Sequence, residues 1–155
     1  MGGSTEGYAR LQPYLKAVGR TLVRVGDSGS GQLTKLVNNL VGGIGLVAAA
    51  EGLSWAAGAG IGAAALAGAL EGGPADSVSL RLLAERLESA DDRPGFSLAN
   101  RLKGMDLALA AARSLGAPMA LGAMAAECFR ERAAVGEGDL DQSVILRRVL
   151  PDGPR

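Results

Sequence analysis

The chain has 155 residues, with 16 Lys plus Arg, 16 Asp plus Glu, no His and one Cys. Balanced charge offers no field that would gather nucleic acid or an anionic membrane, so we expect neither partner. Without His, and with a single Cys, the chain lacks the side chains that build most metal sites, and it forms no intrachain disulfide. We therefore expect no metal and a cytoplasmic protein whose acid or base is a carboxylate, a lysine or a tyrosine.

The first part of the chain predicts a helix, an extended stretch and a much longer helix. Apolar residues recur at helical spacing between residues 6 and 18, with Ser4 or Thr5 as a plausible cap. Residues 21–25, TLVRV, alternate in a way that indicates one short strand or an extended segment. Residues 33–57 are apolar almost throughout and contain no proline, which predicts one long, largely buried helix.

The remainder predicts further helices separated by glycine, proline and acidic turns. They are an Ala-rich segment ending at Leu70, an amphipathic segment over residues 79–90, a helix over 98–115, one that begins at Pro118, and a short amphipathic stretch over 140–150. Cys128 lies on the Pro118 helix, where we expect a small buried hydrophobe rather than a reactive thiol. The sum is an all-α bundle of about six helices around a long buried central helix, with at most one strand.

Residues 52–70 contain no charge and are long enough to cross a membrane, with Gly58 and Gly62 at GxxxG spacing. Most of these residues are Ala or Gly, which contribute little transfer free energy, and the GAGIG cluster interrupts a helix. Small residues on long helices also permit close helix contacts. We therefore favour a tightly packed bundle, which a second subunit's helices can join.

The glycine-rich stretch GDSGSGQLTKLVNN, residues 26–39, admits three interpretations. A phosphate loop requires a lysine where Gln32 stands, so that interpretation fails. A dinucleotide fingerprint requires a third glycine where Thr34 stands, and the chain lacks the alternating strands and helices that build its sheet. The third interpretation makes the glycines an approach to a helix whose first turns carry the chemistry.

Lys35 and Asn39 are spaced i and i+4, which places them on one helix face about 6 Å apart. A lysine can donate to a carbonyl oxygen and take a proton from the resulting hydroxyl, while an asparagine orients the same small ligand. Burial would lower the lysine's pKa towards the working range. The same pair is also typical of a solvated or capping feature near a helix start, so spacing alone leaves both interpretations open.

The stretch GSGQLTKLVNN, residues 29–39, resembles the catalytic helix of the β-hydroxyacid dehydrogenases, the family of 3-hydroxyisobutyrate dehydrogenase and tartronate semialdehyde reductase. The resemblance continues in order through AAAEGL, FSLANRLKGMDLALA, LGAPMALGA and GEGDLDQS. It implies a helical C-terminal domain like that of 6-phosphogluconate dehydrogenase. We accordingly predict residues 1–28 as an N-terminal helix, short strand and linker from the inter-domain region, 29–150 as the helical dehydrogenase domain and 151–155 as a polar tail.

The resemblance also implies roles for individual residues. Lys35 would be the catalytic proton donor and acceptor, Asn39 and Phe96 would bind substrate, and Lys103 would contact the cofactor, NAD or NADP. Family members have an acid directly after that lysine, where this chain has Gly104.

Other readings of these positions compete with the family roles. Asp106 is two residues beyond Gly104, about 200° around a helix, and does not restore the acid. Phe96 could instead fill the core, and Lys103 beside Arg101 could lie on a solvated basic face. Asp141 matches a family position too, but an acid at a helix start is normally a cap.

The functional expectation is the substrate-binding and catalytic domain of an NAD(P)-dependent oxidoreductase that converts a small hydroxy acid to a semialdehyde or keto acid. The family's Rossmann domain has no counterpart in this sequence, so we expect a truncated, split or separately expressed form that is inactive alone. Its partners would be a second copy, bound through the long helices, and a separate Rossmann domain. The alternative is a non-catalytic helical dimerisation module derived from the same family.

Overall fold

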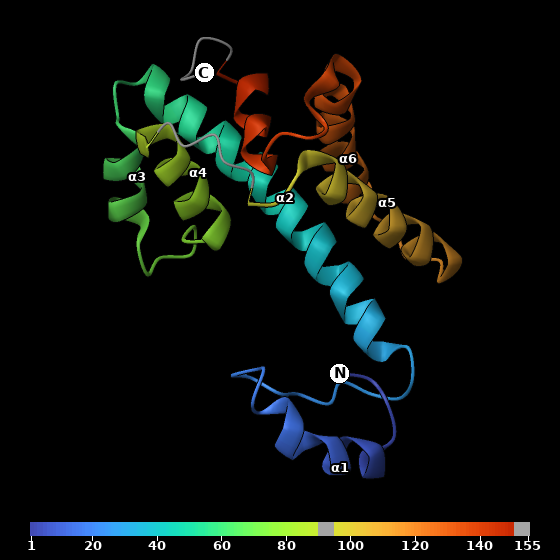
Figure 1. Cartoon of the computed structure of the whole chain (residues 1–155). Coiled ribbons are helices and arrows are strands. Elements are labelled where there is room, and N and C mark those ends of the chain that lie inside the picture. Colours follow the sequence, from blue (N-terminus) through green and yellow to red (C-terminus); the bar gives the residue numbers. More distant parts are fainter. Residues whose placement is uncertain (90–94, 151–155) are drawn as a thin grey trace. The chain divides into compact units, whose positions relative to one another are not determined.

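The computed structural model describes residues 1–89 and 95–150, and the regular secondary structure within them is helical (Figure 1). The all-α prediction is confirmed, and no strand occurs in these ranges. The helices are α1 (Thr5–Leu15), α2 (Ser30–Gly58), α3 (Ala63–Leu70), α4 (Val78–Ser89), α5 (Leu98–Ser114) and α6 (Ala120–Arg132), followed by the π-type turn η1 (Ala133–Glu137) and the 3₁₀ helix η2 (Gln142–Arg148). Residue 90, predicted to end a helix, and the predicted tail 151–155 lie outside the described residues.

The chain forms two compact units, Met1–Asn38 and Asn39–Arg155, and α2 begins in the first and continues into the second. In the first unit, Ser4 caps α1 because its Oγ accepts a hydrogen bond from the Gly7 amide at 3.0 Å. The Tyr8 hydroxyl donates to the carbonyl of Leu22 at 2.9 Å, which ties α1 to the segment that follows it.

Residues 21–25 are not a strand, which corrects one of the two alternatives drawn from their alternating pattern. The Val25 amide donates to the Met1 carbonyl at 2.9 Å, and the Gly3 amide donates to the Gly26 carbonyl at 3.0 Å. These contacts form one isolated bridge, between Gly2 and Gly26, and not a ladder. The extended-segment alternative holds.

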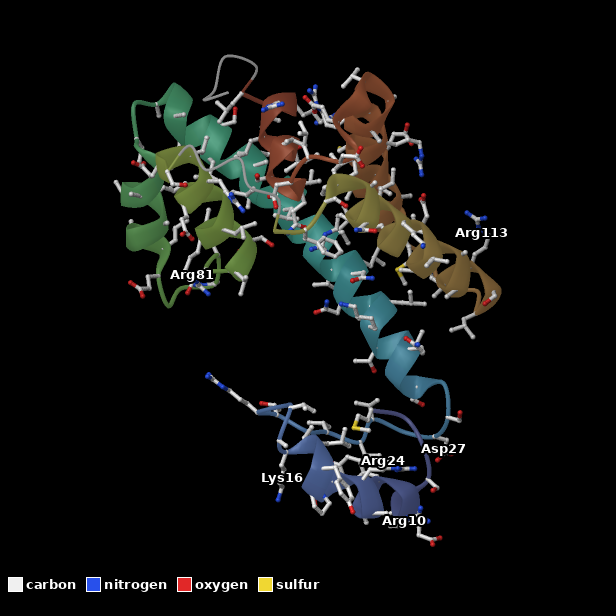
Figure 2. The ribbon with its side chains drawn as sticks, viewed as in Figure 1. Arg10, Lys16, Arg24, Asp27, Arg81 and Arg113 are labelled. Carbon is white, nitrogen blue, oxygen red and sulfur yellow. The ribbon has the colours of Figure 1, made fainter. Side chains whose placement is uncertain are left out.

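The glycine loop before α2 is fixed by Arg24. Its Nε donates to the Gly3 carbonyl at 2.8 Å, and its guanidinium pairs with the Asp27 carboxylate at 2.7 Å (Figure 2). Gly26 and Gly29 adopt positive φ angles of 146° and 93°, which few other residues tolerate. These contacts turn the chain into the start of α2 at Ser30.

In the second unit, α2 is buried along one face. Leu40, Gly43, Leu46, Ala50 and Leu53, at spacings of three or four, lie on that face, as helical periodicity requires. The α3–α4 pair and the α5–α6 pair lie on opposite sides of α2, and η2 contacts α4, α5 and α6 (Figure 1). The largest fully buried side chains are Leu46, Leu53, Leu83, Leu98, Met105, Phe129 and Ile145.

The uncharged stretch 52–70 is divided between α2 and α3 by a turn in which Gly60 has a φ of 78°. The stretch is therefore two helices and does not form the single nineteen-residue helix that a membrane span would need. Among the described residues, α2 itself is long and apolar enough to cross a membrane by length and composition alone, and 33% of its most apolar window is buried inside the structure. A core helix passes the same test.

Candidate functional site

The half-buried side chain of Asn39 on α2 lies directly against Gly104 on α5. A Cβ atom placed on Gly104 would stand 2.5 Å from Asn39 Nδ2, 3.0 Å from its Cγ and 3.2 Å from its Cβ. Real Cβ atoms do not approach other atoms so closely, so a side chain at position 104 would displace Asn39. Asn39 therefore occupies the space beside position 104, where the family resemblance implies an acid.

Two neighbouring glycines on α2 likewise lie close to side chains of α5. A Cβ on Gly43 would overlap the thioether of the fully buried Met105, and a Cβ on Gly42 would lie 3.2 Å from Nη1 of Arg101. Arg101 and Met105 are four residues apart on α5 and therefore share one face. Glycines on both helices thus bring the backbones of α2 and α5 together around Asn39.

The half-buried Arg101 side chain connects three parts of the site. Its Nε donates to Gln142 Oε1 at 2.7 Å, and its Nη1 donates to the backbone carbonyl of Asn39 at 3.3 Å. Its guanidinium carbon lies 5.1 Å from the centre of the Phe96 ring, within cation–π range. Burial lowers the pKa of Arg101 from its usual value, and a guanidinium remains charged even so.

The sequence pattern gave Arg101 no role of its own and named it only as the neighbour of Lys103 in the alternative of a solvated basic face. Its hydrogen-bond partners are 62 and 41 residues away in the chain, at Asn39 and Gln142, so no local spacing reveals them. The adjacent glycines at positions 42 and 43 were the available signal, because they mark a place on α2 where another helix can approach.

Asp141 holds the segment that carries Phe96. Its carboxylate accepts hydrogen bonds from the amides of Gly95 at 2.8 Å, Phe96 at 3.1 Å and Ser143 at 2.9 Å. It is also the N-cap of η2, as predicted. Burial acts to raise the pKa of Asp141, but the hydrogen bonds outweigh burial and leave it below its usual value.

Phe96 is 38% exposed, whereas the other phenylalanine, Phe129, is fully buried. Phe96 is therefore not a core side chain. Its carbonyl accepts from the amide of Gln142 at 2.8 Å, which is the residue that also binds Arg101. Asn39, Arg101, Gln142 and Phe96 thus form one connected group, which we call the Asn39 cluster.

The two lysines predicted for the site are both exposed. Lys35 lies on α2 in the first unit, four residues before Asn39, and Lys103 lies on α5 next to Gly104. Within the described ranges, neither lysine has an ion-pair partner, and both can meet a ligand from solvent. Asp106 pairs with Arg130 of α6 at 2.8 Å and does not take the place of an acid at position 104.

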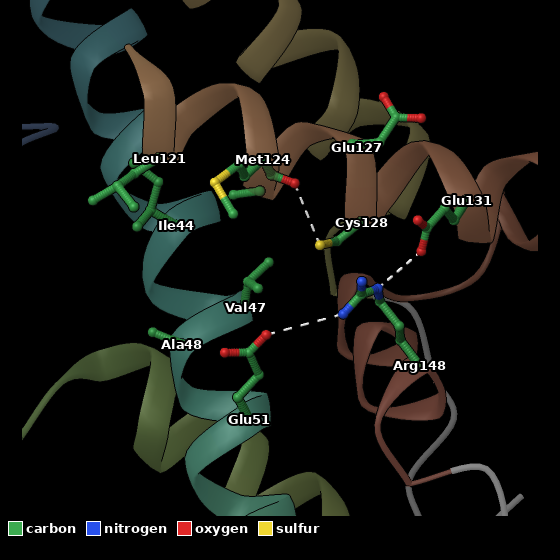
Figure 3. A pocket seen from close by; sticks show the side chains of 11 residues that line it. Ile44, Val47, Ala48, Glu51, Leu121, Met124, Glu127, Cys128, Glu131 and Arg148 are labelled. Atoms are coloured by element: carbon green, nitrogen blue, oxygen red, sulfur yellow. Dashed lines mark hydrogen bonds and ion pairs between the residues drawn. The ribbon is translucent and has the colours of Figure 1, made fainter.

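A hollow of about 380 Å³ lies in the second unit, away from the Asn39 cluster, and is lined by residues of α2, α6 and η2 (Figure 3). Its apolar lining includes Leu121 and Met124, and Arg148 at one end pairs with Glu131 at 2.8 Å. Cys128 on its wall is 8% exposed, and its Sγ donates to the Met124 carbonyl at 3.3 Å. Burial raises the pKa of this thiol, which agrees with a packed rather than a reactive cysteine.

No group of three or more Cys, Asp or Glu side chains in the described part of the chain could hold a metal ion. In the Asn39 cluster, Asn39 and Arg101 are half-buried and Phe96 is exposed, and both lysines are exposed. Amides, ammonium groups and an aromatic ring suit a small polar organic ligand. They can bind a carboxylate or a hydroxyl and move a proton.

Comparison with known proteins identifies the class. A family model described as the NAD-binding of NADP-dependent 3-hydroxyisobutyrate dehydrogenase matches residues 29–149. The 2-hydroxy-3-oxopropionate reductase of Escherichia coli K12 is 31% identical over 147 residues, which are 95% of this chain and 50% of the relative. The helical fold is therefore that of the C-terminal part of NAD(P)-dependent dehydrogenases.

Solved structures agree with this class. The crystal structure of a 3-hydroxyisobutyrate dehydrogenase from Salmonella typhimurium matches with a TM-score of 0.85 and 26% identity, over 95% of this chain and 52% of that one. The Mycobacterium tuberculosis 3-hydroxyisobutyrate dehydrogenase with L-serine also gives 0.85, at 28% identity, over 96% and 53%. The chain belongs to the 3-hydroxyisobutyrate dehydrogenase family, and it spans about half the length of the relatives it matches.

Proposed function

We propose that this chain is the substrate-binding and proton-handling domain of an NAD(P)-dependent dehydrogenase that acts on a small hydroxy acid. The observation that carries the proposal is the family match over residues 29–149, which includes Lys35 and Asn39 on one continuous helix. L-serine, which accompanies the Mycobacterium tuberculosis relative, is itself a small acid with a hydroxyl on its β-carbon. This chemistry supports a β-hydroxy acid as the substrate class.

In the proposed reaction, the side-chain amide of Asn39 orients the hydroxy acid, and the exposed Phe96 ring provides an apolar wall. The Lys35 amine takes the proton from the substrate hydroxyl as the carbonyl forms, and it returns a proton in the reverse direction. NAD(P), when bound, would supply the acceptor for the hydride that leaves the hydroxyl-bearing carbon. Proton and hydride together account for the two hydrogens that the substrate loses.

Lys103 is the residue of this chain that fits the cofactor. Its exposed ammonium on α5 can contact a phosphate or a ribose hydroxyl. The described residues contain no parallel sheet of the kind that holds a dinucleotide. We therefore propose that a separate Rossmann domain holds the rest of the cofactor.

A homodimer through the long helices is part of the proposal. Val41 and Trp55 of α2 are 62% and 84% exposed, and large apolar side chains in such positions favour contact with another subunit. The same observation favours the second candidate function, a non-catalytic dimerisation module. Gly104 adds weight to that candidate, because the family acid is absent and Asn39 contacts the glycine in its place.

The test is hydroxy-acid-dependent reduction of NAD and NADP by the purified chain, with 3-hydroxyisobutyrate and glycerate, with and without a Rossmann domain taken from a relative. We expect turnover only with that domain present, and we expect Lys35→Ala to lower the rate by about 10²–10⁴-fold. Lys16→Ala is the matched control, since Lys16 is an exposed lysine on the C-cap of α1 (Figure 2). A folded dimer without turnover in any mixture would favour the dimerisation module.

A further inference from the structure

Arg101 contacts three residues of the Asn39 cluster, although the family resemblance assigns it no role. It donates to the backbone of Asn39 and to the side chain of Gln142, and it lies over the ring of Phe96. Gln142 in turn receives a second tie, because its amide donates to the Phe96 carbonyl at 2.8 Å. One guanidinium therefore connects the residues assigned to substrate binding on two separate segments of the chain.

The Arg101 guanidinium lies against α2 at Gly42. The Asn39 carbonyl lies within α2, and Arg101 reaches it beside Gly42. A Cβ on Gly42 would lie 3.2 Å from Nη1, which is a tight contact. Partial burial of a guanidinium carries a desolvation penalty, which shows in the lowered pKa of Arg101. Hydrogen bonds and the aromatic face of Phe96 offset that penalty.

We propose that Arg101 is a positioning residue that fixes Asn39 and Phe96 relative to each other and so sets affinity for the hydroxy acid. This inference rests on the proposed function, since it takes Asn39 and Phe96 as the residues that contact substrate. Arg101 acts through them and leaves the proton transfer to Lys35. Its loss therefore weakens substrate binding more than it slows turnover.

The planar fork of Arg101 is needed for this role. Nε and Nη1 donate in two different directions, to Gln142 and to the Asn39 carbonyl, while the flat face covers Phe96. A lysine supplies one point charge and cannot reproduce both directions together with stacking. Arg101→Lys should consequently recover part of the affinity that Arg101→Met loses.

The experiment compares the full chain with its Arg101→Met, Arg101→Lys and Arg113→Met variants, each mixed with the relative's Rossmann domain. Arg113 is an exposed arginine near the end of α5 whose side chain extends away from the helix (Figure 2). For Arg101→Met we expect KM for 3-hydroxyisobutyrate to rise about tenfold, with kcat changed less than about threefold. Arg101→Lys should fall between Arg101→Met and wild type, and Arg113→Met should match wild type.

An unchanged KM in Arg101→Met, including the case in which the apparent kcat alone falls in proportion to a loss of folded protein, would overturn the inference. If wild type shows no turnover, the proposed function fails, and NMR titration of the chain alone with 3-hydroxyisobutyrate decides the positioning role. Saturable shifts of the Asn39 side-chain amide that weaken about tenfold in Arg101→Met, and not in Arg113→Met, would support it. Equal titrations, or none in wild type, would refute it.

Discussion

Two sides of α2 in the second unit differ in how they meet their neighbours. On the side that faces α5, Gly42 and Gly43 lie close against the side chains of Arg101 and Met105. Beside α6, a hollow of about 380 Å³ remains, and Leu121 and Met124 on its rim are 68% and 67% exposed. Glycines make the first side close and polar, whereas larger apolar side chains leave the second open.

This difference indicates what each side is suited to do. A side held by close packing and directed hydrogen bonds can keep polar groups in fixed geometry, which binding a small substrate requires. An open apolar side offers surface area but no fixed polar geometry, which suits contact with other protein. We therefore propose that the substrate binds on the close side, around Asn39.

The matched methionines Met105 and Met124 test the comparison with the largest expected effect. Met105 is fully buried on the close side, so Met105→Ala should lower the free energy of unfolding by about 2–5 kcal/mol. Met124→Ala removes a 67% exposed side chain and should change it by less than about 1 kcal/mol. Urea denaturation of both variants provides the measurement, and equal losses would contradict the distinction between the two sides.

Gly104→Asp introduces the acid that other family members carry. Because a Cβ at position 104 would stand 2.5 Å from Asn39 Nδ2, we expect displacement of Asn39 and a loss of about 1–3 kcal/mol of stability. Thermal unfolding measures the loss, and the Asn39 side-chain amide resonance reports the displacement. A variant as stable as wild type with an unmoved Asn39 would show that the helices have more freedom here than the close packing implies.

The glycines of α2 supply a paired test. Gly43→Ala forces a methyl group into buried Met105 and should lose about 1–2 kcal/mol. Gly52→Ala places the same methyl where no atom lies within 4 Å, and it should gain about 0.5–1 kcal/mol through helix propensity. Denaturation midpoints of the two variants should therefore move in opposite directions, and parallel shifts would count against the close contact at Gly43.

The smallest effect concerns Asp141 and pH. Its folded-state pKa lies below the unfolded value of about 3.9, so its stabilisation is complete above that range and is lost as pH falls through the folded-state pKa. Asp141→Asn should lose about 1 kcal/mol at neutral pH and show a shallower decline in acid. Unfolding at pH 7 and below pH 4 measures both. Some decline in acid should persist in Asp141→Asn as well as in wild type. The pKa of Glu137 is lowered chiefly by its hydrogen bond from Arg132, so protonation of Glu137 destabilises both proteins.

Much of the fold was predictable because its signals are local. The apolar run of α2 and the glycines before α3 each indicate a helix boundary within a few residues of the observed one. The prediction of a strand at 21–25 was wrong because a strand needs a paired ladder, and only a single isolated bridge forms here, between Gly2 and Gly26. Alternation alone does not contain that information.

The candidate site was predictable only in part. Resemblance supplied Lys35, Asn39, Phe96 and Lys103, whose roles stay predictions. The structure adds Arg101, whose partners are brought close by folding, and it explains Gly104 as a contact with Asn39. Such relations depend on how two helices cross, which neither composition nor periodicity determines.

The most direct test of the assignment is an NMR titration of the chain with 3-hydroxyisobutyrate, followed residue by residue. We predict saturable shifts at the Asn39 side-chain amide and at the backbone amides of Phe96 and Arg101, with little change at Ile44, Leu121 and Cys128 around the hollow. Shifts confined to the hollow, or none at the Asn39 cluster at saturating ligand, would contradict the claim that the close side of α2 binds the substrate.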